Sequence, residues 1–274
     1  MTGFRVRFSL NRMPGGQYHR RLAKVLAKPS RFYSTLISKL WPGVSSRPID
    51  LELKDGKRLR VREFWALFLF DEIFMQHCYE APEIIKHGPF KTVIDIGANI
   101  GVFTMRSKQL WPDAHIVAIE PHPDNYRCLQ EHVNINKLSA VKTLQVGVAE
   151  TCGCSDLYIS PRNIAGHSMY QKTGQSVSIP VCTFGEIMGD ISPDEKRCLL
   201  KIDCEGCELP LLNSMTQEIA DRISCIIFEP THSLYNVNDL TRKLTLFGFK
   251  ISQFAGLIVA AKPENPSSSA VLPS

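Results

Sequence analysis

Apolar and polar residues alternate through residues 50–61, which read DLELKDGKRLRV around Asp55-Gly56. A two-residue turn of this kind between alternating segments predicts a β-hairpin. The alternation then gives way to large apolar side chains up to about residue 88, which predicts helices. The longest apolar stretch, residues 64–75, is interrupted by two acids. It therefore predicts a core or interfacial helix and not a membrane span.

From residue 91 the chain changes to short β-branched or apolar segments separated by amphipathic stretches. Two of these stretches, residues 123–137 and 237–247, place their apolar side chains on one helical face. Alternation of strands and helices predicts a parallel sheet covered by helices on both faces, which is a doubly wound α/β fold. The predicted strands are TVIDIG, HIVAIE, VKTLQVGV, CLLKID and SCIIFE.

Two antiparallel pairs are expected in addition. SDLYIS and SVSIPV predict a pair inserted near residues 152–182, and FGFKIS and LIVAAK predict a closing hairpin. The Pro- and Ser-rich tail is expected to be disordered. The predicted organisation is a basic extension (1–49), then one domain (50–262) made of a hairpin and helical lead-in (50–90) and an α/β core (91–262), and a tail (263–274).

Charge is distributed unevenly. Residues 1–49 contain seven Arg and three Lys but no Asp or Glu, so the remaining 22 basic and 27 acidic residues carry a net charge of −5. Three interpretations stay open: a solvated cap or short docking helix, an arm that docks on an anionic membrane or nucleic acid, and an organelle transit peptide. The extension lacks the apolar segment of a secretory signal.

The nine cysteines are an odd number spread through predicted core strands. This pattern predicts reduced thiols in a cytoplasmic setting and not a disulfide framework. Cys152 and Cys154, together with Cys204 and Cys207, leave open a four-thiolate zinc site. We expect instead small buried side chains and no metal site.

The segment VIDIGANIGVFT, residues 93–104, predicts a ligand-binding turn. Gly97 and Gly101 follow the first parallel strand, and ligands of open parallel sheets bind beyond the carboxyl ends of the strands. Glycines let backbone amides approach a ligand there. A dinucleotide fingerprint needs a third glycine where Asn99 stands, so we expect a ligand without a pyrophosphate. Asp95 would repel phosphates but could hold a cationic amino group.

Glu120 ends the next predicted strand, 23 residues after Gly97. An acid at this place can accept hydrogen bonds from both ribose hydroxyls. The ligand is thus a nucleoside with a positively charged tail, and S-adenosylmethionine fits that description. NAD is the alternative, which Glu120 allows and Asn99 disfavours. The adenine end is assigned to Gly147 and Val148.

The segments VIDIGANIGVFT, AIEPHPDNY, LLKIDCEGCELPLL and IIFEPTH resemble the FkbM-type methyltransferases. The resemblance covers about residues 50–260. It implies the class I methyltransferase fold, a Rossmann-like seven-stranded sheet with a reversed last strand, and methyl transfer from S-adenosylmethionine, usually to a hydroxyl. It also implies that Asp203 and Glu205 form the floor of the reaction site. The candidate cofactor-binding residues are Asp95, Gly97, Ala98, Asn99, Gly101, Phe103, Glu120, Pro121, Gly147, Val148 and Asp203.

Methyl transfer requires an aligned acceptor, exclusion of water and, for a hydroxyl, a general base. Asp203 and Glu205 follow the fourth strand, and Glu229 and His232 follow the fifth. The candidate catalytic residues are Asp203, Glu205 and His232, and His167 of the inserted loop could close over the substrate.

Two other interpretations of these residues stay open. Lys201, Asp203, Glu205 and Glu208 could form a local ion-pair set, and His232 could be a polar surface group. An acid pair could also bind a divalent metal.

The leading hypothesis is an O-methyltransferase that acts on a hydroxyl of a small metabolite, lipid or glycan. The alternatives are an NAD-dependent oxidoreductase and a non-catalytic S-adenosylmethionine-binding module that docks on an anionic surface. No specific nucleic acid is expected, because the Asn/Asp-Pro-Pro-aromatic signature is absent after the fourth strand. We expect a cytoplasmic protein, with peripheral membrane association or a transit peptide left open.

Overall fold

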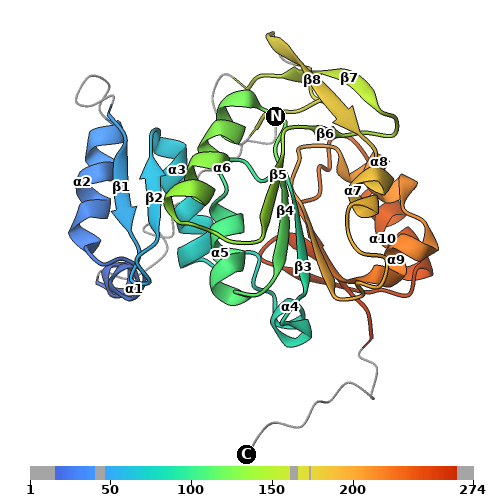
Figure 1. The fold of residues 1–274 in the computed structure, drawn as a ribbon, viewed down its shortest axis with the longest axis horizontal. Coiled ribbons are helices and arrows are strands. Elements are labelled where there is room, and N and C mark those ends of the chain that lie inside the picture. The colour runs from blue at the N-terminus through green and yellow to red at the C-terminus, as the bar shows by residue number, and fades with distance from the viewer. Residues whose placement is uncertain (1–15, 41–46, 161–165, 173, 264–274) are drawn as a thin grey trace, which may run out of the picture.

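The computed structural model describes residues 16–40, 47–160, 166–172 and 174–263. Figure 1 shows a central sheet with helices on both faces and a smaller sheet beside it. The predicted tail lies outside the described residues apart from its first residue, and so does part of the predicted inserted loop.

The central sheet has seven strands in the order β11-β12-β10-β9-β3-β4-β5. β12 is antiparallel to both of its neighbours, and the other pairings are parallel. This is the class I methyltransferase arrangement, and it confirms the predicted α/β fold with its reversed last strand. The strands are β3 (Thr92–Ile96), β4 (His115–Ile119), β5 (Val141–Leu144), β9 (Cys198–Ile202), β10 (Ile223–Phe228), β11 (Lys250–Phe254) and β12 (Leu257–Ala261).

The two faces of the sheet bury separate apolar clusters. All five residues of β3 are buried; Val93 belongs to one cluster, whereas Ile94 and Ile96 belong to the other. Such alternation follows from the period of two along a strand. In Figure 1, α5 and α6 cover one face and α7 to α10 cover the other. The helices are α4 (Pro82–His87), α5 (Val102–Leu110), α6 (Pro123–Ile135), α7 (Phe184–Gly189), α8 (Glu208–Ser214), α9 (Gln217–Arg222) and α10 (Val237–Leu246).

The segment VKTLQVGV, predicted as one strand, is divided between two sheets. Its first part is β5, at the edge of the central sheet, and its end is β6 (Gly147–Val148). β6 pairs with β8 (Ser176–Cys182), which pairs antiparallel with β7 (Gly153–Tyr158). The predicted inserted pair is therefore confirmed, with a third strand added. After β5, at the edge of the central sheet, the chain therefore passes into the smaller sheet, where β6 pairs with β8.

The described part of the basic extension packs against the lead-in. It forms α1 (Gln17–Val25) and α2 (Pro29–Leu40), which lie beside the hairpin of β1 (Ile49–Glu52) and β2 (Arg58–Val61) in Figure 1. Leu22 and Phe32 are fully buried in the same cluster as Leu59 of β2. The basic side chains of this segment are mostly exposed: Arg20, Arg21, Lys24, Lys28 and Arg31.

The apolar stretch 64–75 is helical, as predicted. It forms α3 (Phe64–Phe70) and a turn of π-helix, η2 (Asp71–Met75). Asp71 is buried and accepts hydrogen bonds from the hydroxyl of Tyr18 at 2.7 Å and from the side-chain amide of Gln76 at 2.9 Å. Within the described part of the chain, no helix is both long enough and apolar enough to cross a membrane.

Candidate functional site

The glycine turn after β3 is held between the ends of two neighbouring strands. Gly97 has a φ of 74°, and a Cβ added there would lie 1.7 Å from the carbonyl oxygen of Asp203. Gly101 has a φ of 85°, and its added Cβ would lie 2.6 Å from Cδ1 of Leu129 in α6. Gly97 therefore requires glycine for space as well as for backbone conformation, because the close atoms are backbone, whereas at Gly101 the positive φ is the main requirement.

Glu120 is oriented by backbone groups of the same turn. The amide of Asn99 donates to Oε2 of Glu120 at 2.8 Å, and the amide of His122 donates to Oε1 at 2.9 Å. The side chain is buried. Burial raises its pKa to about 7, although the two amide hydrogen bonds oppose this shift. The carboxyl group is thus fixed at the end of β4.

The structure places Asp95, which was predicted to hold a cationic amino group, in a buried ion pair. It is fully buried and is not among the described residues that line the two cavities below. Its Oδ1 lies 3.0 Å from Nζ of Lys201, and its Oδ2 accepts a hydrogen bond from Thr104 at 2.7 Å. The reason is register, because Asp95 and Lys201 are directly paired across β3 and β9.

Lys201 ties this ion pair to the glycine turn. Its Nζ donates to the carbonyl oxygen of Gly97 at 2.8 Å and lies 3.8 Å from Oδ2 of Asp203. Burial opposes its charge, but the carboxylates of Asp95 and Asp203 raise the pKa of Lys201. Of the ion-pair set that the sequence left open, Lys201 and Asp203 therefore lie within ion-pair distance of each other. The acid closest to Lys201 is Asp95, which was not part of that set.

A first cavity lies beyond the carboxyl ends of β3, β4 and β9 and is bordered by the insert. Its wall on the insert side includes Leu157, His167 and Met169. Most of the predicted cofactor residues line it together with the predicted catalytic residue Glu205: Gly97, Asn99, Glu120, Pro121, Gly147, Val148 and Asp203. Gly101 starts α5 next to this cavity and does not belong to its described lining.

A second cavity adjoins the first and is lined partly by the lead-in. Five residues line both cavities, so the two meet at the glycine turn and the end of β9: Leu69, Gly97, Asn99, Asp203 and Glu205. The predicted residues Ala98 and Phe103 lie on this second side. Six lining residues come from the lead-in and were not predicted for the site: Phe68, Leu69, Glu72, Ile73, Cys78 and Tyr79.

The second cavity is rich in carboxyl groups. Burial, together with the neighbouring carboxylates of Asp203 and Glu229, raises the pKa of Glu205 to about 8 and that of Glu72 to about 8. Burial and the charge of Asp203 raise the pKa of Glu229 to about 7. Tyr79 donates a hydrogen bond to Oδ2 of Asp203 at 2.7 Å. At neutral pH the Glu72 and Glu205 carboxyl groups, with pKa values of about 8, are mostly protonated, so they can both donate hydrogen bonds to a polar ligand and accept them from it.

Of the two candidate histidines, only His167 reaches a cavity. Its ring stacks on that of His122 with centroids 4.2 Å apart. Burial and the nearby His122 lower the pKa of His167 to about 4, so it is neutral at pH 7. His232 is exposed and lies outside the described lining of both cavities. It sits in the turn after β10, where its amide bonds to the carbonyl of Pro230, and this placement does not support a role as catalytic base.

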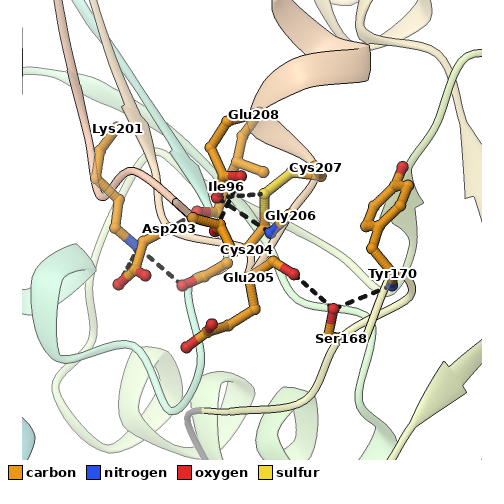
Figure 2. The surroundings of a disulfide bond; sticks show 12 residues. Ile96, Ser168, Tyr170, Lys201, Asp203, Cys204, Glu205, Gly206, Cys207 and Glu208 are labelled. Carbon is orange, nitrogen blue, oxygen red and sulfur yellow. Dashed lines mark hydrogen bonds and ion pairs between the residues drawn. A yellow bond between two sulfur atoms is a disulfide. The ribbon is translucent and has the colours of Figure 1, made fainter. Parts of the chain in front are cut away.

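The expectation that all cysteines are reduced is wrong for one pair. Cys204 and Cys207 form a disulfide with Cα atoms 5.6 Å apart, in the turn between Asp203 and Glu208 (Figure 2). Their sulfurs are bonded to each other and cannot act as thiolate ligands of zinc in this state. The other seven cysteines are free, and Cys152 and Cys154 are exposed. Among the described residues, no group of three or more His, Cys, Asp or Glu is placed to hold a metal ion.

The chain is similar in sequence to several known methyltransferases. The family model described as "Methyltransferase FkbM domain" matches residues 95–251. Methyltransferase sdnD of Sordaria araneosa is 30% identical over 213 residues, which cover 65% of this chain and 81% of that protein. The 31-O-demethyl-FK506 methyltransferase FkbM of Streptomyces tacrolimicus is 33% identical over 95 residues, covering 33% of this chain and 32% of that protein. The hexuronic acid methyltransferase AglP of Haloferax volcanii is 27% identical over 154 residues, covering 55% of this chain and 60% of that protein. The names of the last two relatives give 31-O-demethyl-FK506 and hexuronic acid as what they methylate.

The buried ion pair generates a prediction about stability. Lys201→Met leaves the Asp95 carboxylate buried without its cation, so we expect the free energy of unfolding in urea to fall by about 3–5 kcal/mol. Adding Asp95→Asn should restore a large part of this loss. The control is Lys142→Met, which removes an exposed pair with Asp190 and should cost less than about 1 kcal/mol. Equal, small losses in both single variants would contradict a structural role for the pair.

The raised pKa of Glu205 predicts a pH dependence of stability. The folded-state pKa of about 8 exceeds the ordinary glutamate value of 4.5, so between these two pH values the folded state holds a proton that the unfolded state has lost. This stabilisation is complete below pH 4.5 and disappears as the pH rises through 8. The free energy of unfolding should therefore decrease between pH 5 and pH 8, and less steeply in Glu205→Gln. The exposed Glu218→Gln serves as control, and identical slopes in all three proteins would refute the assignment.

Proposed function

Because the chain belongs to the FkbM family of S-adenosylmethionine-dependent methyltransferases, we propose that it methylates a hydroxyl group of a small metabolite, lipid or glycan. The observation that carries the proposal is the meeting of two cavities at Asp203 and Glu205, one with a nucleoside-type lining and one rich in carboxyl groups. Relatives that by name act on a small molecule and on a hexuronic acid support acceptors of this class.

The first cavity fits S-adenosylmethionine. The buried Glu120 carboxyl, already fixed by two amides, is suited to the adjacent hydroxyls of a ribose. Gly97 and Asn99 would contact the methionine portion through the backbone of the glycine turn. Apolar side chains around Gly147 and Val148 provide a surface for adenine. When bound there, the cofactor supplies a methyl group already activated by its sulfonium.

The second cavity would hold the acceptor. A hydroxyl oxygen that attacks the methyl carbon must lose its proton, and Asp203 at the junction is the proposed base. Its Oδ2 is engaged by the Tyr79 hydroxyl, which fixes the carboxyl plane and leaves Oδ1 for the acceptor. Glu205 lines the same junction and is proposed to orient the acceptor by a hydrogen bond. The apolar Phe68, Leu69 and Phe103 around this cavity help to exclude water.

Cofactor binding is tested first by calorimetric titration with S-adenosylmethionine, S-adenosylhomocysteine and NAD. We expect saturable binding of the two adenosyl compounds and none of NAD. Glu120→Gln should weaken adenosyl binding at least tenfold, because hydrogen bonds to a charged group contribute about 1.5–3 kcal/mol. Glu218→Gln should bind as the unaltered protein does. Tight binding of NAD, or unchanged affinity in Glu120→Gln, would overturn the cofactor assignment.

The catalytic assignment is tested by transfer of a labelled methyl group to a panel of hydroxyl compounds that includes macrolides and hexuronic acids. With an acceptor that is methylated, Asp203→Asn should lower kcat about 100-fold or more, because it removes the base. Its affinity for S-adenosylhomocysteine should change little, which separates loss of chemistry from loss of the cofactor site. Activity that survives in the double variant Asp203→Ala/Glu205→Ala would exclude both residues from catalysis.

A further inference from the structure

We propose that the Cys204–Cys207 disulfide is a reversible redox site that controls the affinity of the first cavity for its adenosyl ligand. A dithiol reductant would open the bond and weaken binding, and a bound ligand would shield the bond. This inference rests on the proposed function, because the cavity is the one assigned to S-adenosylmethionine.

The disulfide belongs to the wall of that cavity. Cys204 and Cys207 both line it, next to Asp203 and Glu205. Cys204 is partly exposed, whereas Cys207 is fully buried, so a reductant approaching through the cavity meets Cys204 first. A ligand that fills the cavity would occupy the same approach.

The bridge closes a ring around two residues in unusual backbone conformations. Glu205 has a φ of 54° and Gly206 a φ of 124°. A non-glycine residue in the left-handed region costs about 1–3 kcal/mol and persists where its surroundings hold it. The disulfide closes a covalent ring that limits the other backbone conformations available to this turn, as a cross-link does. Without it, Glu205 is free to leave that conformation, and its side chain would then leave the junction of the cavities.

The ring also positions the insert. Ser168 Oγ donates to the carbonyl oxygen of Glu205 and accepts hydrogen bonds from the amides of Tyr170 and Gln171 at 3.0 Å (Figure 2). A Cβ added to Gly206 would lie 3.0 Å from the Tyr170 side chain, so the two segments touch. His167 and Met169, on either side of Ser168, form part of the cavity wall. Relaxation of the ring would therefore loosen the part of the wall formed by His167 and Met169.

The exchange needs a dithiol and no other reactant. A thiolate of the dithiol attacks Sγ of Cys204 and forms a mixed disulfide, and Cys207 departs as a thiolate that takes up a proton. The second thiol of the reductant then attacks the sulfur by which the reductant is bonded to Cys204. This attack closes the reductant into a ring and releases Cys204 as a thiol. Two electrons pass to the protein, and the reductant becomes a cyclic disulfide.

Thiol counting by mass spectrometry tests the pairing and its shielding. The full chain, alkylated in denaturant, should react at seven cysteines before and nine after treatment with dithiothreitol. Saturating S-adenosylhomocysteine should slow the change from seven to nine at least tenfold. Nine reactive cysteines without any reductant, or a rate indifferent to the ligand, would overturn the proposal.

Calorimetry on the two redox forms tests the coupling. Reduced protein should bind S-adenosylhomocysteine at least tenfold more weakly, and the ligand should shift the reduction equilibrium by the same factor, as linkage requires. Cys204→Ser/Cys207→Ser should bind like reduced protein with or without dithiothreitol, whereas Cys152→Ser/Cys154→Ser should keep the response. Equal, tight binding by both redox forms would overturn the redox control alone. Failure of both forms to bind would overturn the proposed function and the coupling that rests on it.

Discussion

The ion pair between Lys201 and Asp95 is the interaction on which the candidate site depends. It joins the two central strands of the sheet, β3 and β9, at the point where strand order reverses. The Lys201 ammonium lies 3.0 Å from Asp95 and donates to the Gly97 carbonyl, so one buried cation holds both the strand end and the glycine turn. A charge so deeply buried is tolerated only with partners of this quality. The cavity lining is thus anchored by an ion pair whose acid, Asp95, is absent from the described lining, whereas Lys201 itself lines the second cavity.

The two cavities of the candidate site differ in how their carboxyl groups are surrounded. On the cofactor side, backbone amides fix a single buried carboxyl, Glu120. On the other side, Glu72, Glu205 and Glu229 have raised pKa values because each is desolvated close to other carboxylates. Tyr79 engages Asp203 among them. Glu72 and Glu205, mostly protonated at neutral pH, suit an uncharged, hydrogen-bonding acceptor. Glu120 differs from them because two backbone amides hold its carboxyl group in place.

Periodicity and motif spacing predicted the sheet and its closing hairpin, because these features are local in sequence. With the family resemblance, they also predicted nine of the 18 described residues that line the first cavity. The structure differs from the prediction in relations that local patterns do not encode. Asp95 was assigned to a ligand because sequence spacing does not show that strand register pairs it with Lys201, and Tyr79 was missed because its contact with Asp203 spans 124 positions. His232 was assigned to catalysis because it follows β10 in the sequence. Sequence spacing does not show that the turn after β10 leaves this residue exposed and outside both cavities. The disulfide between Cys204 and Cys207 depends on the geometry of the turn that joins them, and the number of cysteines in the sequence gives no information about that geometry.

The origin of the two cavity walls has a consequence for how such an enzyme changes its substrate. The family match begins at residue 95, whereas Phe68, Glu72 and Tyr79 of the second cavity come from the segment before it. That segment shares one apolar cluster with α1, α2 and one face of the central sheet. Under the proposed function, substitution of Phe68, Glu72 or Tyr79 would change the acceptor side, and none of these residues lines the first cavity. Acceptor preference would then diverge within this short stretch of the chain while the lining proposed for the cofactor stays the same.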